Sequence, residues 1–216
     1  MFKRFSLFAV LCTAAFASQS HADGLPAPTV DYSADRIMET EAGTFDGRVY
    51  FSRDKERLEM NARGMQSVMI LRRDQQLGWM LMPAQRMYQK VDLARAQQQS
   101  GSQSADTVTI EQVGAETIEG HAATKYKMLM KDGSGGGFIW VTQDGIPVKM
   151  DFLGKNGRDK TRMTVTLTNL TIGEQDPALF ELPGDYKAMP SFPGFGGQPS
   201  GKNGLLGAAK GLFSRN

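Results

Sequence analysis

The sequence predicts a mostly β protein whose core is an antiparallel meander of ten or eleven strands. Along much of the chain, apolar residues recur at every second position, which is the side-chain period of a strand with one buried face. Polar turns of two to five residues separate these segments, and the Asp144-Gly145 pair is a hairpin signal. No repeat with a period of 20 to 50 residues is present, so we expect neither a solenoid nor a propeller.

The expected strands lie between residues 31 and 172, with one helix midway. The apolar positions that define them are 32–38, 49–51, 58–60, 68–71, 79–82, 87–91, 108–113, 123–130, 138–142, 148–153 and 161–172. Residues 92–99 combine an N-cap candidate with good helix formers, which predicts a helix of two turns. Asp176-Pro177 is expected to open one helical turn through Phe180, because proline suits the first helical position.

The first 22 residues have the features of a secretory signal peptide. Lys3 and Arg4 precede an apolar run over residues 5–17, and Ser20-His21-Ala22 is a small-x-small cleavage pattern. The apolar run is too short for a stable membrane span. We therefore expect export to the periplasm, cleavage after Ala22 and no transmembrane span in the mature protein.

The composition of the mature chain excludes several classes of site. Removing the leader takes away two basic residues and leaves 23 basic and 23 acidic side chains, so no charge argument favours nucleic acid. The leader also holds the one cysteine, and His121 is the single remaining histidine. Disulfides, cysteine-based zinc sites and multi-histidine metal sites are thereby excluded, and we expect neither a cofactor nor an enzyme. Paired carboxylates on a β scaffold are left open.

The mature chain divides into four parts by composition. Residues 23–30 are an extended lead-in, 31–187 are the β domain, 188–203 are a linker rich in proline and glycine, and 204–216 are an amphipathic tail. Two mixed-sign clusters, at 53–56 and 72–74, are expected at solvated hairpin tips.

Four features in this order resemble the LolA/LolB-like superfamily of bacterial envelope proteins, in one of its uncharacterised periplasmic branches. They are the leader, the opening meander 45–60 (FDGRVYFSRDKERLEM), the segment 79–88 (WMLMPAQRMY) and the closing stretch 118–186. That stretch contains WVTQDGIP at 140–147 and DPALFELP at 176–183. The resemblance implies an open antiparallel half-barrel with an apolar concave face and one or two short covering helices. It also implies carriage of acyl chains or other lipids, although residues 23–30 cannot form the opening helix of the known carriers.

An apolar face on an open sheet needs a cover, which a lipid-like ligand supplies in such carriers. Methionine, which is flexible and polarizable, suits a face that adapts to varied shapes, although methionine also fills ordinary cores. The residues expected on the concave, ligand-binding face are Val49, Phe51, Leu58, Met60, Ile70, Trp79, Leu81, Tyr126, Met128, Trp140 and Met150. Arg48 and Arg86 are expected at the cavity rim, where a guanidinium would meet a head group or carboxylate.

Two functions follow from this interpretation. The first is a periplasmic binding or carrier protein for an apolar or acylated molecule. The second is an envelope protein-interaction or stress-sensing module without a small-molecule ligand, in which the half-barrel or the tail docks on a protein partner. The sequence identifies neither the ligand nor the partner.

Overall fold

The fold is a single open sheet of twelve strands, seen in a computed structural model that describes residues 24–62, 64–94, 108–156 and 159–189. The strands are β1 (Tyr32–Thr40), β2 (Gly43–Ser52), β3 (Lys55–Ala62), β4 (Met65–Arg72), β5 (Leu77–Met82), β6 (Met87–Asp92), β7 (Val108–Ile118), β8 (His121–Met130), β9 (Gly135–Thr142), β10 (Pro147–Asn156), β11 (Asp159–Ile172) and β12 (Lys187–Ala188). Their spatial order is β12-β6-β5-β4-β3-β2-β1-β11-β10-β9-β8-β7, so the sheet is not closed.

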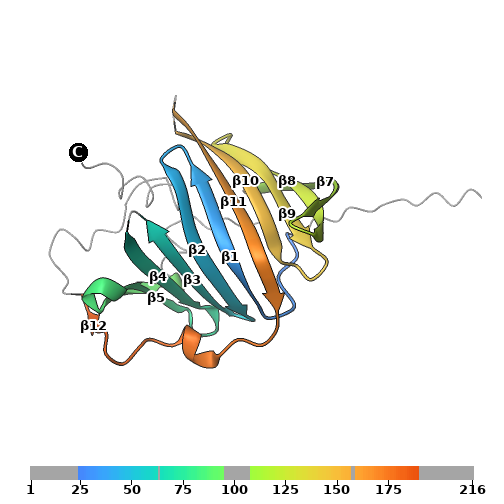
Figure 1. Ribbon diagram of the computed structural model, residues 1–216. Helices are drawn as coiled ribbons and strands as arrows, with labels where there is room; N and C mark the ends of the chain where they lie inside the picture. The colour runs from blue at the N-terminus through green and yellow to red at the C-terminus, as the bar shows by residue number, and fades with distance from the viewer. Residues whose placement is uncertain (1–23, 63, 95–107, 157–158, 190–216) are drawn as a thin grey trace, which may run out of the picture.

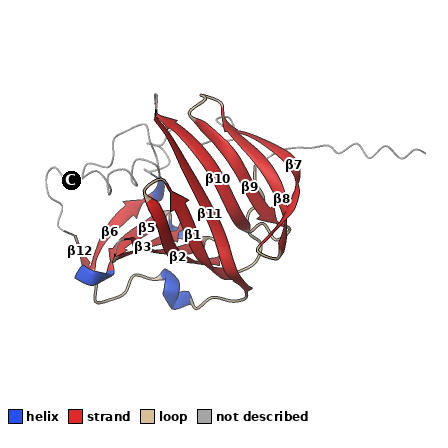
Figure 2. Cartoon of the chain, turned by 45° about the horizontal axis from the view of Figure 1, so that its top comes forward, coloured by secondary structure: helices blue, strands red, loops and turns tan. Residues whose placement is uncertain are grey.

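The sheet curves into a half-barrel, as the resemblance predicted. Figures 1 and 2 show the central strands β2, β1, β11 and β10, with β3 to β6 turning away on one side and β9 to β7 on the other. Hairpins join neighbouring strands along each half, and the long antiparallel pair of β1 and β11 joins the two halves. The residues expected in strands lie in strands, because their period-two pattern matches a sheet with one apolar face.

One predicted detail of the fold needs correction. The twelfth strand, β12, has two residues and runs parallel to β6, whereas the sequence predicted only antiparallel strands. A strand this short leaves no periodic signal, and its pairing depends on the chain returning across the sheet. The midway helix lies largely outside the described residues: Asp92 ends β6, and Leu93 and Ala94 are helical.

The described helical elements with assigned bounds are 3-10 turns of three or four residues. They are η1 (Arg73–Gln75), η2 (Pro83–Gln85) and η4 (Pro177–Phe180). The predicted turn at η4 is confirmed, since Pro177 occupies its start and the Asp176 side chain accepts a hydrogen bond from the Ala178 amide at 2.9 Å. These turns cap hairpins or cover a small patch, so most of the sheet is not covered by described helices.

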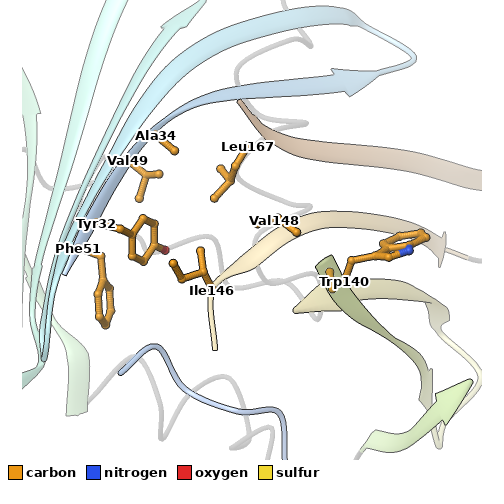
Figure 3. Packing of buried hydrophobic residues seen from close by; sticks show 9 residues of the cluster. Tyr32, Ala34, Val49, Phe51, Trp140, Ile146, Val148 and Leu167 are labelled. Carbon is orange, nitrogen blue, oxygen red and sulfur yellow. The ribbon is translucent and has the colours of Figure 1, made fainter. Parts of the chain in front are cut away.

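Most of the larger core cluster lies on the concave face, which we define as the face that carries Tyr32, Ala34, Val49 and Phe51. Figure 3 shows these side chains pointing into the space that the sheet curves around, toward Ile146. Ala123 and Trp140 of the same cluster lie on the opposite face by strand register. Tyr32 and Phe51 stack with ring centroids 5.3 Å apart. The cluster therefore joins β1 and β2 to the start of β10 and stabilises the bend of the sheet.

A second, smaller core lies on the opposite face, which we call the outer face. Phe180 of η4 is 1% exposed and packs against Val68, Ile70 and Leu81. The segment after β11 thus crosses the outer face of β3 to β5 before it reaches β6. This contact fixes the C-terminal part of the domain to the sheet.

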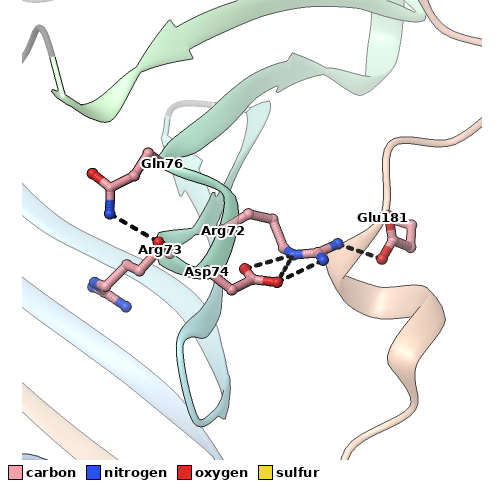
Figure 4. Close-up of polar contacts among 5 residues, drawn as sticks. All are labelled: Arg72, Arg73, Asp74, Gln76 and Glu181. Carbon is pink, nitrogen blue, oxygen red and sulfur yellow. Dashed lines mark hydrogen bonds and ion pairs between the residues drawn. The ribbon is translucent and has the colours of Figure 1, made fainter.

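Arg72 anchors the same segment. The sequence placed Arg72 at a solvated hairpin tip, but its side chain is 7% exposed and pairs with Asp74 at 2.8 Å and with Glu181 (Figure 4). The sequence did not reveal this burial, because Glu181 lies 109 residues further along the chain and only the fold brings it to Arg72. Hydrogen bonds from Arg72 hold the pKa of the Asp74 carboxyl below its ordinary value of 3.8.

Replacing Phe180 by alanine is expected to lower the free energy of unfolding by about 3 kcal/mol, because the change leaves a cavity in the outer core. Leu129, which is 44% exposed, serves as the control, and Leu129→Ala should cost less than about 0.5 kcal/mol. Urea denaturation measures both changes. Equal, small losses for the two variants would show that η4 does not hold the sheet.

Asp74→Asn is expected to lower the free energy of unfolding at pH 7 but not well below pH 3.8. A carboxyl whose pKa is depressed by folding contributes stability above its unfolded pKa and loses it as the pH falls through the folded pKa. Urea denaturation at pH 7 and at about pH 2 tests this. Asp54→Asn is the control, since the Asp54 side chain makes no ion pair within the described residues. A deficit of Asp74→Asn that persists in acid would contradict the prediction.

Candidate binding face

Methionine side chains are concentrated on the concave face. In an antiparallel sheet, directly paired residues project from the same face, so the register assigns every strand residue to one side. Met69 pairs with Leu58 and Met80, and Met38 pairs with Phe45. By this register, all eleven methionines in the described strands lie on the concave face: Met38, Met60, Met65, Met69, Met80, Met82, Met87, Met128, Met130, Met150 and Met163.

Most of these methionines are half-buried. Met80 and Met65 are more open, at 38% and 65% exposed, whereas the core residues Val49 and Ala34 on the same face are at 3% and 0%. The concave face therefore consists of a closed aliphatic and aromatic centre with an accessible methionine lining beside it. Such a lining has few fixed rotamers and adapts to the shape of an apolar partner.

The structure places seven of the predicted ligand-binding residues on the concave face. Val49 pairs with Leu58, and Met150 pairs with Ile139, which in turn pairs with Tyr126. The seven residues are Val49, Phe51, Leu58, Met60, Tyr126, Met128 and Met150. They span both halves of the sheet, so the predicted set is brought together over a broad surface rather than in one pocket.

The other four predicted residues lie on the outer face. Ile70 pairs with Trp79 and Arg57, and Leu81 pairs with Val68. Residues 68–71 form an uninterrupted apolar run, so alternation alone did not reveal which of them face outward. The outer core against Phe180 explains why this stretch is apolar on both sides.

Trp140 also projects from the outer face, where it is surrounded by charge. Its Nε1 donates a hydrogen bond to Glu116 at 2.9 Å, and the Nζ atoms of Lys125 and Lys149 lie 4.8 and 5.1 Å from the indole ring. The ring is buried by these cation–π contacts together with apolar neighbours, among them Phe138 with a ring centroid 6.1 Å away. Sequence pattern does not distinguish a tryptophan of this kind from one that lines an apolar cavity.

The two predicted rim arginines lie apart from the methionine lining. Arg48 is on the outer face of β2, where it pairs with Asp35 at 2.7 Å and lies 5.4 Å from the Tyr50 ring. Arg86 follows η2 in the β5–β6 turn, with a side chain that is 73% exposed and 3.6 Å from Asp185. Contact of either residue with a ligand stays a prediction.

Sequence reasoning missed the charged groups of the concave face. Arg36 and Glu56 are the two charged side chains that the register places on this face of strands β1 to β6. Burial lowers the pKa of the Arg36 guanidinium, and the Glu56 carboxylate acts in the opposite direction. The signal was present in the sequence, because Arg36 lies between Ala34 and Met38 in the period-two pattern of β1.

The outer face also contains a shallow polar hollow of about 380 Å³. Asp35, Asp46 and Glu59 line it together with Arg48, and the Asp35 carboxylate is already bound by Arg48 and Asn169. Among the described residues, no group of three or more histidine, cysteine, aspartate or glutamate side chains is placed to hold a metal ion. The hollow is a polar surface feature without the apolar lining of the concave face.

The chain belongs to a family that is described as Domain of unknown function (DUF4412), whose profile matches residues 35–150. That match covers more than half of the chain and includes β2 to β9. No curated protein matches the sequence. None of the described helical segments has the length and hydropathy of a membrane span.

Solved structures are similar to this chain at low sequence identity. An uncharacterized conserved protein from Thermus thermophilus is 13% identical over 74% of this chain and 90% of that chain, with a TM-score of 0.55. MucB, in a complex with MucA(peri), is 14% identical over 75% of this chain, with a TM-score of 0.49, and this chain spans 56% of the MucB chain.

A putative outer membrane lipoprotein-sorting protein domain from Vibrio parahaemolyticus is 12% identical over 69% of this chain and 89% of that chain, with a TM-score of 0.33. The likeness to the Thermus protein shows the fold alone.

Dilute hydrogen peroxide is expected to oxidise Met65 and Met80 several-fold faster than Met38 and Met69, because oxidation follows exposure of the thioether. Peptide mass spectrometry of timed samples measures the sulfoxide at each site. The urea-unfolded chain is the control, in which the four rates should converge. Equal rates in the folded protein would contradict the assigned exposure of the lining.

Proposed function

We propose that this protein is an exported binding or carrier protein that holds an apolar or acylated molecule on its concave face. The observation that carries the proposal is the segregation of eleven methionines to one face of an open sheet. A core needs no such segregation, since methionine as a gap filler would also be expected in the outer cluster of Val68, Ile70, Leu81 and Phe180. That cluster contains none within the described residues.

The energetics of an apolar ligand fit such a surface. Removal of apolar area from water contributes about 25 cal/mol per Å², so an acyl chain gains affinity in proportion to its length without directional contacts. The methionine lining beside the aliphatic core offers this area, and its flexible side chains tolerate different chain shapes. The proposal assigns no catalytic residue to the protein.

The proposed location is the periplasm. Residues 1–22, which the sequence predicts to be the leader, lie outside the described residues, as do the linker beyond Met189 and the amphipathic tail. Fusion of residues 1–22 to a reporter enzyme that is active only after export tests the location directly.

Met80→Glu is expected to weaken binding of the neutral probe 1-N-phenylnaphthylamine by at least tenfold. A carboxylate in the middle of the lining would be desolvated by the ligand, while the 38% exposure of Met80 lets the free protein keep it hydrated. Probe fluorescence on titration measures the affinity. Lys90→Glu is the control, because it adds the same carboxylate to an exposed outer-face position that pairs with Trp79.

Two results would contradict this function. One is the absence of probe uptake by the wild type together with a lipid-free native mass spectrum after purification from a Gram-negative periplasm. The other is an equal loss of affinity in Met80→Glu and Lys90→Glu. A lipid-free protein that instead retains a protein partner through the concave face would be the interaction module.

A further inference from the structure

Arg36 occupies a central position on the concave face. It lies in the middle of β1, where it pairs with Gly47 of β2 on one side and with Leu167 of β11 on the other. Its neighbours on the same face of β1 are Ala34 and Met38. A guanidinium is thus set into a surface that is otherwise aliphatic and methionine-rich, at the junction of the two halves of the sheet.

No carboxylate forms an ion pair with Arg36 within the described residues. Glu56, the other charged group on this face of β1 to β6, is bound by Arg73 at 2.5 Å. The arginines of the outer face differ, since Arg48 and Arg57 each have a carboxylate partner at 2.7 Å. Arg36 therefore keeps a positive charge for which the described part of the chain provides no hydrogen-bonded counter-ion.

The Arg36 guanidinium is within reach of a ligand. Arg36 is half-buried. Among the described residues, every fully buried side-chain nitrogen has a hydrogen-bond partner. Since the Arg36 guanidinium has no such partner there, its nitrogens keep some accessible surface. Gly47, directly opposite on β2, has no side chain to cover it. A Cβ at Gly47 would lie 2.2 Å from the backbone oxygen of Glu59, so close strand packing requires glycine here.

We propose that Arg36 is a head-group anchor and that the ligand is an anionic amphiphile, an acyl chain that ends in a carboxylate or a phosphate. The inference rests on the proposed function and deepens it by naming the ligand class. A guanidinium donates two parallel hydrogen bonds to either anion, and these are stronger where water is partly excluded. The chain of such a ligand would extend from Arg36 along the methionine lining.

The electrostatics support this assignment. Burial lowers the pKa of the Arg36 guanidinium below its ordinary value, which reflects the cost of holding its charge in an apolar setting. An anionic ligand offsets that cost, whereas a neutral amphiphile leaves it in place and removes further water. Affinity should therefore depend on the charge of the head group and not only on the length of the chain.

The test is a displacement titration with three ligands that share a 16-carbon chain. Palmitate carries a carboxylate, palmitoyl lysophosphatidic acid carries a phosphate, and hexadecanol is neutral. Each displaces 1-N-phenylnaphthylamine from the wild type, Arg36→Met and Arg162→Met. The wild type is expected to bind palmitate or the phosphate ligand at least tenfold more tightly than hexadecanol. The preferred anion identifies the source of the head group.

Arg36→Met is expected to lose at least tenfold in affinity for the anionic ligands. Its affinity for hexadecanol should not fall and should rise if the neutral ligand desolvates the guanidinium in the wild type. Arg162→Met, which removes an exposed arginine from the outer face of β11, should change neither. Arg36→Lys keeps the charge without the bidentate geometry and should lie between. Far-ultraviolet circular dichroism and urea denaturation verify that each variant is folded.

The outcomes separate the two proposals. Failure of the wild type to bind the neutral probe overturns the carrier function and this inference with it. Probe binding with equal affinity of the wild type for palmitate and hexadecanol overturns the inference alone, even if Arg36→Met does not fold. An equal effect of Arg36→Met and Arg162→Met on palmitate binding overturns it as well.

Discussion

An open antiparallel sheet with one apolar face places a constraint on everything else in this structure. The sheet has edges at β7 and β12, so it cannot enclose its own interior as a closed barrel does. Tyr32, Val49 and Phe51 bury the centre of the concave face against Ile146, but the methionines around them remain half-exposed. An incomplete core of this kind is the physical reason for proposing a ligand.

The two faces of the sheet meet this constraint in different ways. On the outer face, η4 buries Phe180, and Arg72 binds Asp74 and Glu181, so the apolar patch there is covered by the chain itself. On the concave face, the adaptable lining and Arg36, which has no ion-pair partner, have no equivalent cover among the described residues. The face that the chain completes is structural, and the face that it leaves incomplete is the candidate binding surface.

The sequence predicted the strands and the hairpins well, but it predicted the candidate face only in part. Leu58 and Met60 alternate with charged residues, so their common face was readable. Ile70, Trp79 and Leu81 belong to segments that are apolar on both sides, so alternation did not predict their face. Trp140 lies among charged side chains on the outer face, which its apolar ring did not indicate. Arg36 was overlooked because a single charge in an alternating strand resembles a solvated one.

The sequence by itself determined the mostly β class, the succession of strands along the chain and the helical turn at Asp176-Pro177, because alternation and turn chemistry are local properties. Only the tertiary structure decided which face each strand residue occupies, that Arg72 meets Glu181, and that β12 adds to the sheet beside β6. These depend on strand register and on contacts between distant segments, and a shift of one residue in register exchanges the two faces.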